Sequence, residues 1–274
     1  MTELPVSPYL FDNSAPQGAD RFAALEAAYD AVSRRQLELT GLAAGWRCLE
    51  VGGGGGSLGS WLGERVGPGG EVTVTDLDLR WAVRGERPDQ VRLMRHDIVR
   101  DPLPEGAYDL VHARLVLMHL PDRHQVLNRL VTALRPGGWL VLEDFDCTPV
   151  RVLSDPGGGA GPLFEKVHGA VMRLLAGAGT DLGWGRHARG AMAKVGLTDL
   201  TESEHTEEWH GGGTEISLHR HNVAQTTDRL TSDEGISPDE LARFDTLLEN
   251  PSFAVSAYPL ISVRGRRPHR MLCV

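Results

Sequence analysis

A run of five glycines begins two residues after Glu50, where the chain reads E-V-G-G-G-G-G-S as far as Ser57. Glycine lacks a β-carbon, so such a run lets a ligand approach the backbone closely. Between a strand and a helix, the E-x-G-x-G-x-G spacing is typical of a cofactor site, although glycine-rich turns also occur where only flexibility is needed. We therefore select Glu50, Gly52, Gly54 and Gly56 as candidate cofactor-binding residues and expect the loop to leave room for a ligand.

Two acidic residues follow the loop at the ends of the next two expected strands. Asp76, which Leu77 follows, lies about twenty residues after the loop, where a carboxylate can accept hydrogen bonds from both ribose hydroxyls of an adenosine. Asp97 can accept a hydrogen bond from an adenine amino group while Ile98 packs on the ring. Each aspartate taken singly fits a strand-end or helix-capping role better. The loop and both acids in this order favour a cofactor that contains adenosine.

The glycine loop fits two classes of cofactor. The segment 54–59 also matches G-x-G-x-x-G, which would place the pyrophosphate of a nicotinamide dinucleotide at a helix N-terminus. An acidic residue beside the loop opposes a pyrophosphate, whereas S-adenosylmethionine (SAM) carries an ammonium and a sulfonium. Glu50 therefore favours SAM, and an NAD(P)-dependent oxidoreductase is the alternative enzyme.

Transfer of a methyl group from a sulfonium needs mainly alignment and exclusion of water, and a general base only if the acceptor must lose a proton. His119 is the first candidate base because it follows the fourth expected strand and histidine titrates near neutral pH. A structural role beside Pro121 is the alternative for His119. His168, Glu143 and Asp146 are lesser candidates.

Two groups of residues invite a metal-site interpretation. Glu143, Asp144 and Asp146 resemble part of a divalent-cation site, but the rest of a ligand set is missing. His219 and His221 have a spacing that suits one side of a strand, whereas the surrounding pattern is helical and no cysteine is close. We therefore predict no metal site.

The elements that must position these residues alternate along the first half of the chain. Apolar runs bounded by glycine, proline and aspartate predict strands at 46–51, 71–76, 91–94, 108–113 and 139–142. Helical periodicity predicts helices at 20–39, 57–66 and 122–134. Strands alternating with helices indicate an α/β fold with a parallel, doubly wound sheet.

The second half is less regular, and we expect it to select the substrate. Helical patterns occur at 163–175, 186–195, 215–230 and 238–248, and strands are expected at 200–209 and 260–263. The total of 274 residues suits one domain with an added element.

Composition excludes several classes of protein. The formal net charge of -9 argues against a nucleic-acid partner, which would need a basic surface. No apolar run approaches the roughly 20 residues of a membrane span, and the N-terminus lacks a signal pattern, so we expect a cytoplasmic protein with no membrane partner. Cys48, Cys147 and Cys273 are far apart and odd in number, which predicts reduced thiols.

These motifs in order resemble those of class I SAM-dependent methyltransferases over about residues 46–144. The matching segments are Leu49 to Gly56, Val74 to Asp76, His96-Asp97, Tyr108 to Val111, Leu117 to Asp122 and Leu134 to Gly138. Bacterial methyltransferases of secondary metabolism look especially similar, including the run 113–120 and the closing segment 265–268. Gly53 departs from the family pattern, which often has cysteine there, and we expect it to loosen the loop.

The resemblance implies a seven-stranded Rossmann-like sheet in the order 3-2-1-4-5-7-6, whose last strand pair is antiparallel and formed near residues 200 and 260. It implies an N-terminal helical cap at 1–40, a SAM-binding core at 41–150, and a remainder at 151–274 with a helical, substrate-binding lid at about 211–250. It also implies roles for site residues. Gly52, Gly54 and Gly56 would line the methionine part of SAM, Asp76 the ribose, Asp97 and Ile98 the adenine, and the backbone of Ala113 and Arg114 the amino-acid group.

The function implied is methyl transfer from SAM to an oxygen, nitrogen or carbon of a small-molecule acceptor, in secondary metabolism such as antibiotic biosynthesis, with S-adenosylhomocysteine as product. A noncatalytic protein with this fold is the alternative from another class. Acceptor identity and homo-oligomer formation stay open, because pocket shape and surface complementarity are not encoded in periodicity.

Overall fold

A computed structural model describes residues 10–11, 17–148 and 150–269. Seven strands form one sheet in the order β3-β2-β1-β4-β5-β10-β7. Their bounds are β1 Arg47–Val51, β2 Glu71–Asp76, β3 Val91–Arg95, β4 Tyr108–Arg114, β5 Leu134–Phe145, β7 Thr198–His205 and β10 Leu260–Arg266. The strands β1 to β5 are parallel, and β10 is antiparallel to both β5 and β7. The predicted order and the antiparallel pair are therefore confirmed.

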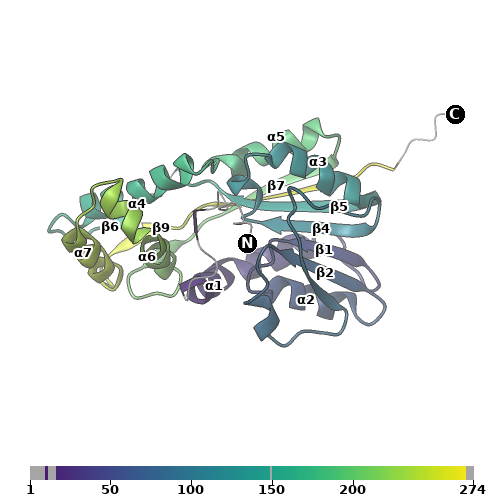
Figure 1. Cartoon of the computed structure of the whole chain (residues 1–274), viewed down its shortest axis with the longest axis horizontal. Helices are drawn as coiled ribbons and strands as arrows, with labels where there is room; N and C mark the ends of the chain where they lie inside the picture. The colour runs from purple at the N-terminus through teal and green to yellow at the C-terminus, as the bar shows by residue number, and fades with distance from the viewer. Residues whose placement is uncertain (1–9, 12–16, 149, 270–274) are drawn as a thin grey trace, which may run out of the picture.

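Helices cover both faces of this sheet (Figure 1), with α2 on one side and α3 and α5 on the other. The bounds are α1 Gln17–Glu38, α2 Ser57–Val66, α3 Arg123–Ala133, α4 Ala160–Gly177, α5 Trp184–Lys194, α6 Ser217–Ser232 and α7 Pro238–Leu248. Two short 3-10 helices, η1 Ala82–Arg84 and η2 Leu117–His119, follow β2 and β4. Each of the seven helices agrees with an expected helix to within three residues at either end.

The expected strand at 200–209 is wrong in one respect, because the chain leaves the large sheet after His205. The segment β8 Glu208–His210 instead pairs with β9 Ala254–Ser256, which also pairs with β6 Val152–Ser154 in a second, three-stranded sheet. Trp209 gives the physical reason, since it is 2% exposed and packs on Tyr29, away from the large sheet. This small sheet, which the sequence did not predict, lies with α4, α6 and α7 at one end of the molecule (Figure 1).

Hydrophobic cores form on both faces of the large sheet, as expected for buried parallel strands. Alternate residues of β1 divide between them, with Cys48 in the core beneath α2 and Leu49 in the larger core on the other side. Cys48 and Cys147 are buried free thiols, in agreement with the expectation, and Cys273 lies outside the described residues. Every helix in the described part of the chain is too short or too polar to cross a bilayer.

The strand register brings the candidate residues to one edge of the sheet. Val51 at the end of β1 lies opposite Thr75 of β2 and Ala113 of β4. Arg114 then lies opposite Glu143 of β5. Because the strands are parallel, their carboxyl ends and the loops that follow form one continuous edge, where open α/β sheets bind ligands.

Candidate active site

The glycine loop leads from β1 directly into α2, as the sequence predicts. Gly52, Gly54 and Gly56 have φ angles of 69°, 53° and 87°, a region that residues with a β-carbon rarely adopt. At Gly53, a β-carbon would lie 2.3 Å from a methyl group of Val74, so close packing favours glycine there, and the expected loosening of the loop stays a prediction. The loop is therefore seated tightly against β2.

Asp76 faces this loop from the end of β2. Its Oδ2 accepts a hydrogen bond from the Gly54 amide at 3.0 Å, and its Oδ1 accepts one from the Asp78 amide at 3.0 Å. Burial raises the pKa of Asp76, while the backbone hydrogen bonds from Asp78, Gly54 and Leu77 partly offset that rise. The structure thus brings together the loop and the acid that the sequence assigned to the ribose. The Leu77 side chain is exposed beside them.

The side chain of Asp97 stabilises the turn after β3. Its Oδ1 accepts a hydrogen bond from the Val99 amide at 2.9 Å, and its Oδ2 lies 3.5 Å from the Arg100 guanidinium. Ile98 is buried in the larger hydrophobic core. The strand-end role weighed for Asp97 is therefore present, and the adenine roles of Asp97 and Ile98 stay predictions.

The exit of β4 lies against the glycine loop and has an unusual backbone. A β-carbon on Gly52 would lie 2.4 Å from a methyl group of Val116. Leu115 has φ = 56°, which is unfavourable for a bulky side chain. Such backbone conformations persist where surrounding structure enforces them, often at functional sites. Ala113 and Arg114 therefore lie beside the loop, next to a turn in which Leu115 has an unfavourable backbone conformation.

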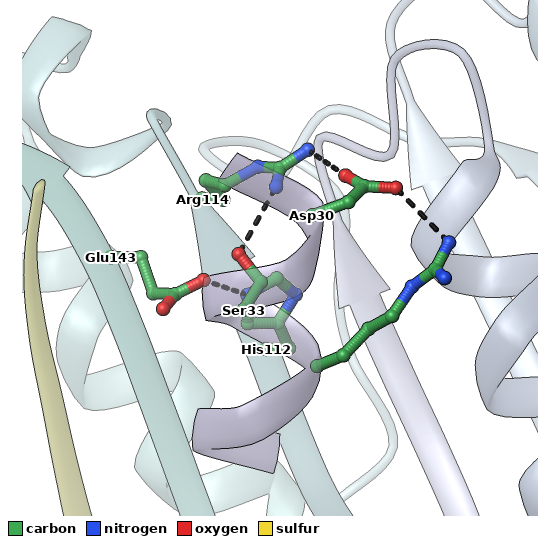
Figure 2. Close-up of polar contacts among 6 residues, drawn as sticks. Asp30, Ser33, His112, Arg114 and Glu143 are labelled. Carbon is green, nitrogen blue, oxygen red and sulfur yellow. Dashed lines mark hydrogen bonds and ion pairs between the residues drawn. The ribbon is translucent and has the colours of Figure 1, made fainter. Parts of the chain in front are cut away.

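Arg114 connects this exit to α1 through its side chain (Figure 2). Its guanidinium donates to Asp30 Oδ1 at 2.9 Å and to Ser33 Oγ at 3.0 Å. Asp30 also accepts a hydrogen bond from Arg34 at 3.4 Å. The sequence assigned only the Arg114 backbone to the site, and spacing gave no signal for this clamp because its partners are more than eighty residues away.

Glu143, one of the candidate bases, belongs to a network below α1 (Figure 2). Its carboxylate lies 3.2 Å from His112 Nε2 and accepts a hydrogen bond from Ser262 Oγ at 2.6 Å. These groups are buried on the sheet, and the hydrogen bonds from His112 and Ser262 lower the pKa of Glu143 against the effect of burial. Glu143 is therefore a structural acid.

The three acids considered for a metal site point to different partners. Asp144 accepts a hydrogen bond from the Met118 amide at 3.4 Å, whereas Asp146 pairs with Arg186 at 2.9 Å. Among the described residues, no three His, Cys, Asp or Glu side chains gather as metal ligands would.

Helix α1 lies directly over the glycine loop. A β-carbon on Gly54 would lie 2.7 Å from the Phe22 ring, and one on Gly55 would lie 2.2 Å from Glu26 Oε1. Glu26 also hydrogen-bonds Ser57 at the start of α2, while burial raises its pKa. Phe22 and Glu26 therefore fill the space directly over Gly54 and Gly55, and a cofactor that contacts these two glycines from that side requires this part of α1 to move.

Glu50 is a buried acid with an unpartnered carboxyl oxygen. It is 4% exposed, and its Oε2 has no hydrogen-bond partner among the described residues. Burial raises the pKa of Glu50 to about 8, although the charge of Arg114 acts in the opposite direction. At neutral pH, Glu50 is thus largely protonated, and a nearby cationic ligand would favour its ionisation.

A cavity of about 30 Å³ lies beside η2, between α1, β5, α4 and α6. Its walls are mainly apolar, and they include Leu115 of the turn after β4. A water molecule fits a space of this size, but an organic acceptor does not. The polar wall residues are Arg21, His119, Asn222 and Tyr258.

His119 lies on the cavity wall, but its surroundings make it a weak base. Its Nδ1 lies 3.2 Å from Thr180 Oγ1. Burial and the charges of Arg21 and Arg123 lower the pKa of His119 to about 3. The imidazole is therefore neutral throughout the physiological range.

Tyr258 is a cavity residue that the sequence did not indicate. Its hydroxyl lies 3.1 Å from His168 Nε2 and 3.2 Å from His219 Nδ1. The two histidines are packed around Phe164, and burial lowers the pKa of each. Since His168 and His219 lie 90 and 39 residues from Tyr258 in sequence, no local motif could reveal the cluster.

Comparison with known families agrees with this geometry. A family model described as a methyltransferase domain matches residues 19–200. The chain belongs to this methyltransferase-domain family. The resemblance found in the sequence is confirmed, and the oxidoreductase alternative is rejected.

Curated relatives of this methyltransferase-family chain match over part of their length. Methyltransferase str2 of Strobilurus tenacellus is 30% identical over 129 residues, which are 46% of each chain. The 27-O-demethylrifamycin SV methyltransferase of Amycolatopsis mediterranei is 31% identical over 139 residues, or 47% of this chain and 50% of the relative. Methyltransferase GfsG of Streptomyces halstedii is 31% identical over 125 residues, or 44% and 45%. The matches thus span about half of each relative.

Solved structures share the fold at low sequence identity. The YcgJ protein of Bacillus subtilis has a TM-score of 0.53 at 15% identity, covering 83% of this chain and 94% of its own. The [4+2]-cyclase SpnF has a TM-score of 0.51 at 15% identity, covering 88% and 81%. The second protein shows that the fold by itself does not specify the reaction.

Replacement of Glu50 by Gln should change how stability depends on pH. The raised pKa means that the folded protein holds a proton that the unfolded chain releases, so wild-type stability should fall as pH rises from about 4.5 to about 8. Glu50→Gln removes this loss, which is roughly 3 to 5 kcal/mol at about 1.4 kcal/mol per pKa unit. Urea unfolding at several pH values measures it.

The exposed Glu64 of α2 provides the matched control, and Glu64→Gln should follow the wild-type pH dependence. Parallel curves for wild type and Glu50→Gln would show that Glu50 is not held protonated in the fold.

Replacement of Arg114 by Met should loosen α1. The variant loses the hydrogen bonds to Asp30 and Ser33, and we expect a loss of about 1 to 3 kcal/mol in the free energy of unfolding. Hydrogen exchange of α1 amides should accelerate. Arg34→Met, which removes a longer bond from a more exposed side chain, should have a smaller effect. Equal exchange rates in wild type and Arg114→Met would contradict the clamp.

Proposed function

We propose that this methyltransferase-family chain transfers the methyl group of SAM to an oxygen, nitrogen or carbon of a small molecule, with S-adenosylhomocysteine as product. The observation that carries the proposal is the placement of Asp76 against the glycine loop, 3.0 Å from the Gly54 amide, with Glu50 and its unpartnered Oε2 buried beside it. These are an acceptor for ribose hydroxyls and an acid that a cation would ionise.

The residues present fit a cationic cofactor better than an anionic one. Burial raises the pKa of Glu50, and the nearby acids Asp30, Glu26 and Asp76 raise it further, so acidic groups surround the loop. A pyrophosphate would be repelled there, whereas the ammonium and sulfonium of SAM would be attracted. This arrangement supports the choice of SAM that the sequence suggested from Glu50 alone.

Individual roles follow the sequence assignment. Gly52, Gly54 and Gly56 would contact the methionine part, Asp76 the ribose and Asp97 with Ile98 the adenine. Leu77 would cover the nucleoside, and the backbone of Ala113 and Arg114 would hold the amino-acid group. Phe22 and Glu26 must first withdraw from the loop.

When bound, SAM supplies a methyl group that its sulfonium has already activated. The chain then has to hold the acceptor in line and exclude water. The cavity at the exit of β4 has apolar walls for this, and at about 30 Å³ it has to widen before an organic acceptor can enter. His119, the catalytic candidate from sequence, can contact the acceptor but is a weak base at pKa about 3. Tyr258, whose hydroxyl lies 3.1 Å from His168 Nε2, can orient an acceptor by hydrogen bonding. It gives no stronger base, because burial lowers the pKa of His168 to about 4, so the proposal relies on alignment of the acceptor rather than on a general base.

The names of the relatives support a small acceptor in secondary metabolism, with antibiotic biosynthesis as the specific proposal. One relative is named for rifamycin, and another is a Streptomyces methyltransferase. The cyclase among the structural neighbours has this fold and a name for a different reaction, so the proposal of methyl transfer relies on the family match and not on the fold alone. Cytoplasmic location, the absence of a nucleic-acid partner and homo-oligomer formation remain predictions.

We propose α1 as the cap and α6 with α7 as the lid. Helix α1 covers the glycine loop and packs against α6, and α6 packs against α4 and α7. The cavity lies between α1, α4 and α6, so their separation would open it. These contacts support roles for α1 within the proposed cap at 1–40, and for α6 and α7 within the proposed lid at about 211–250. Most of the cap before α1 lies outside the described residues, and the boundaries, with the SAM-binding core at 41–150, stay predictions.

Replacement of Asp76 by Ala tests the cofactor assignment. Calorimetry should show binding of S-adenosylhomocysteine to the wild type, and a weakening of about 1 to 3 kcal/mol in the variant, the scale of a lost charged hydrogen-bond partner. NADH should not bind. Asp89→Ala changes an exposed acid and should bind like wild type. An unchanged affinity in Asp76→Ala would overturn the ribose assignment, and no binding to the wild type would overturn the proposed function.

A further inference from the structure

Arg21 of α1 is a buried cation on the wall of the cavity beside η2. It is 6% exposed, although arginine is almost never buried to this degree without a charged partner. The neighbouring wall residues Leu115, Met118 and Phe145 are apolar. A charge in such surroundings has lost much of its hydration, and the apolar walls offer few polar groups to replace the lost water.

The partners of Arg21 are neutral. Its Nε donates a hydrogen bond to Asn222 Oδ1 at 3.1 Å, and its guanidinium carbon lies 4.4 Å from the centroid of the Phe11 ring. Among the described residues, no carboxylate forms an ion pair with it. Arg114 is the contrast on the same side of the molecule, because its guanidinium is neutralised by Asp30 at 2.9 Å. Within the part of the chain that the structure describes, the positive charge of Arg21 is thus solvated by an amide and a ring but not neutralised.

The charge of Arg21 also acts electrostatically on two other polar groups of the cavity wall, His119 and Tyr258. It contributes to the lowered pKa of His119, and it opposes the rise in the pKa of Tyr258 that burial causes. His119 is itself neutral, so among the described wall residues Arg21 carries the positive charge, while Arg123 acts on His119 from outside the wall. An anionic group entering there would meet a cation with little competing solvent.

We propose that the acceptor carries a carboxylate, which Arg21 binds while the apolar walls hold the hydrocarbon part. The proposal rests on the proposed function, because it names the substrate class of the same site. A carboxylate matches the planar guanidinium geometry. The single negative charge of a carboxylate also matches the single positive charge of Arg21, whereas a phosphate monoester carries nearly two negative charges.

The position of Arg21 would couple acceptor binding to closure of α1. It directly precedes Phe22, whose ring covers Gly54, and lies five residues before Glu26. A carboxylate bound to Arg21 would therefore hold this part of α1 near the glycine loop. Because the same part of α1 must withdraw to admit a cofactor, the acceptor would bind after the cofactor.

The test compares near-isosteric ligands that differ in charge. Calorimetry on the full chain saturated with S-adenosylhomocysteine would measure benzoate, cinnamate and octanoate against benzamide, cinnamamide and octanamide, with phenyl phosphate as a second anion. At least one carboxylate should bind about tenfold or more tightly than its amide, the scale of a charged hydrogen bond. That preference should disappear in Arg21→Gln and in the apolar Arg21→Met, and be retained in part by Arg21→Lys.

Arg35→Gln is the matched control, because Arg35 is an exposed arginine of the same helix, and its carboxylate preference should equal that of wild type. Thermal unfolding separates binding from folding: Arg21→Met should melt at or above the wild-type temperature, since removing an uncompensated buried charge costs little. A structural arginine would instead lower the melting temperature of that variant and leave ligand preference unchanged.

Three results would overturn the proposal. They are the absence of any carboxylate-over-amide preference in wild type, a preference that survives Arg21→Gln, and tighter binding of phenyl phosphate than of every carboxylate. If S-adenosylhomocysteine still binds normally, any of these results contradicts only the proposed class of acceptor. Failure of the wild type to bind S-adenosylhomocysteine contradicts the proposed function instead.

Discussion

The ion pair between Arg114 and Asp30 fixes the arrangement on which the site depends. Arg114 is at the end of the central strand β4, so its bond to α1 sets where that helix crosses the edge of the sheet. With α1 held there, Phe22 reaches the glycine loop and Arg21 reaches the cavity. One contact therefore positions both the part of α1 that covers the cofactor loop and the part that faces the acceptor.

The sequence predicted those parts of the site that depend on local chemistry. The glycine loop requires positive φ angles and close packing, which only glycine permits, and the acid ending β2 follows at the length of one βαβ unit. It could not predict contacts set by tertiary packing. For example, Glu26 lies over Gly55, and Tyr258 lies between two histidines. The residues in each contact are far apart in the sequence, so no periodic pattern could indicate the contact. Tertiary packing also decides that Trp209 belongs to a second sheet. Alternation of apolar and polar residues indicates a strand but not the strand with which it pairs.

Two buried ionisable groups of opposite type lie at the two ends of the site. Glu50 has an unpartnered carboxyl oxygen beside the glycine loop, and the Arg21 guanidinium at the cavity has no acidic partner among the described residues. Each costs stability in the free protein, because burial opposes the charged form. A protein selected only for folding would replace both by apolar residues. Their presence is physically consistent if ligands supply the missing charges, a cation beside Glu50 and an anion beside Arg21.

Opening and closing of α1 links these two charges. The free chain closes Phe22 and Glu26 over the loop, so the cofactor competes with α1 for the same backbone surface. Movement of α1 would carry Arg21 away from Asn222 and widen the cavity at the same time. Closure would then return Arg21 to the cavity and remove solvent from both ligands, and this desolvation strengthens every charge interaction inside. A helix that carries groups for both ligands can thus make the assembled, water-free state depend on the presence of both.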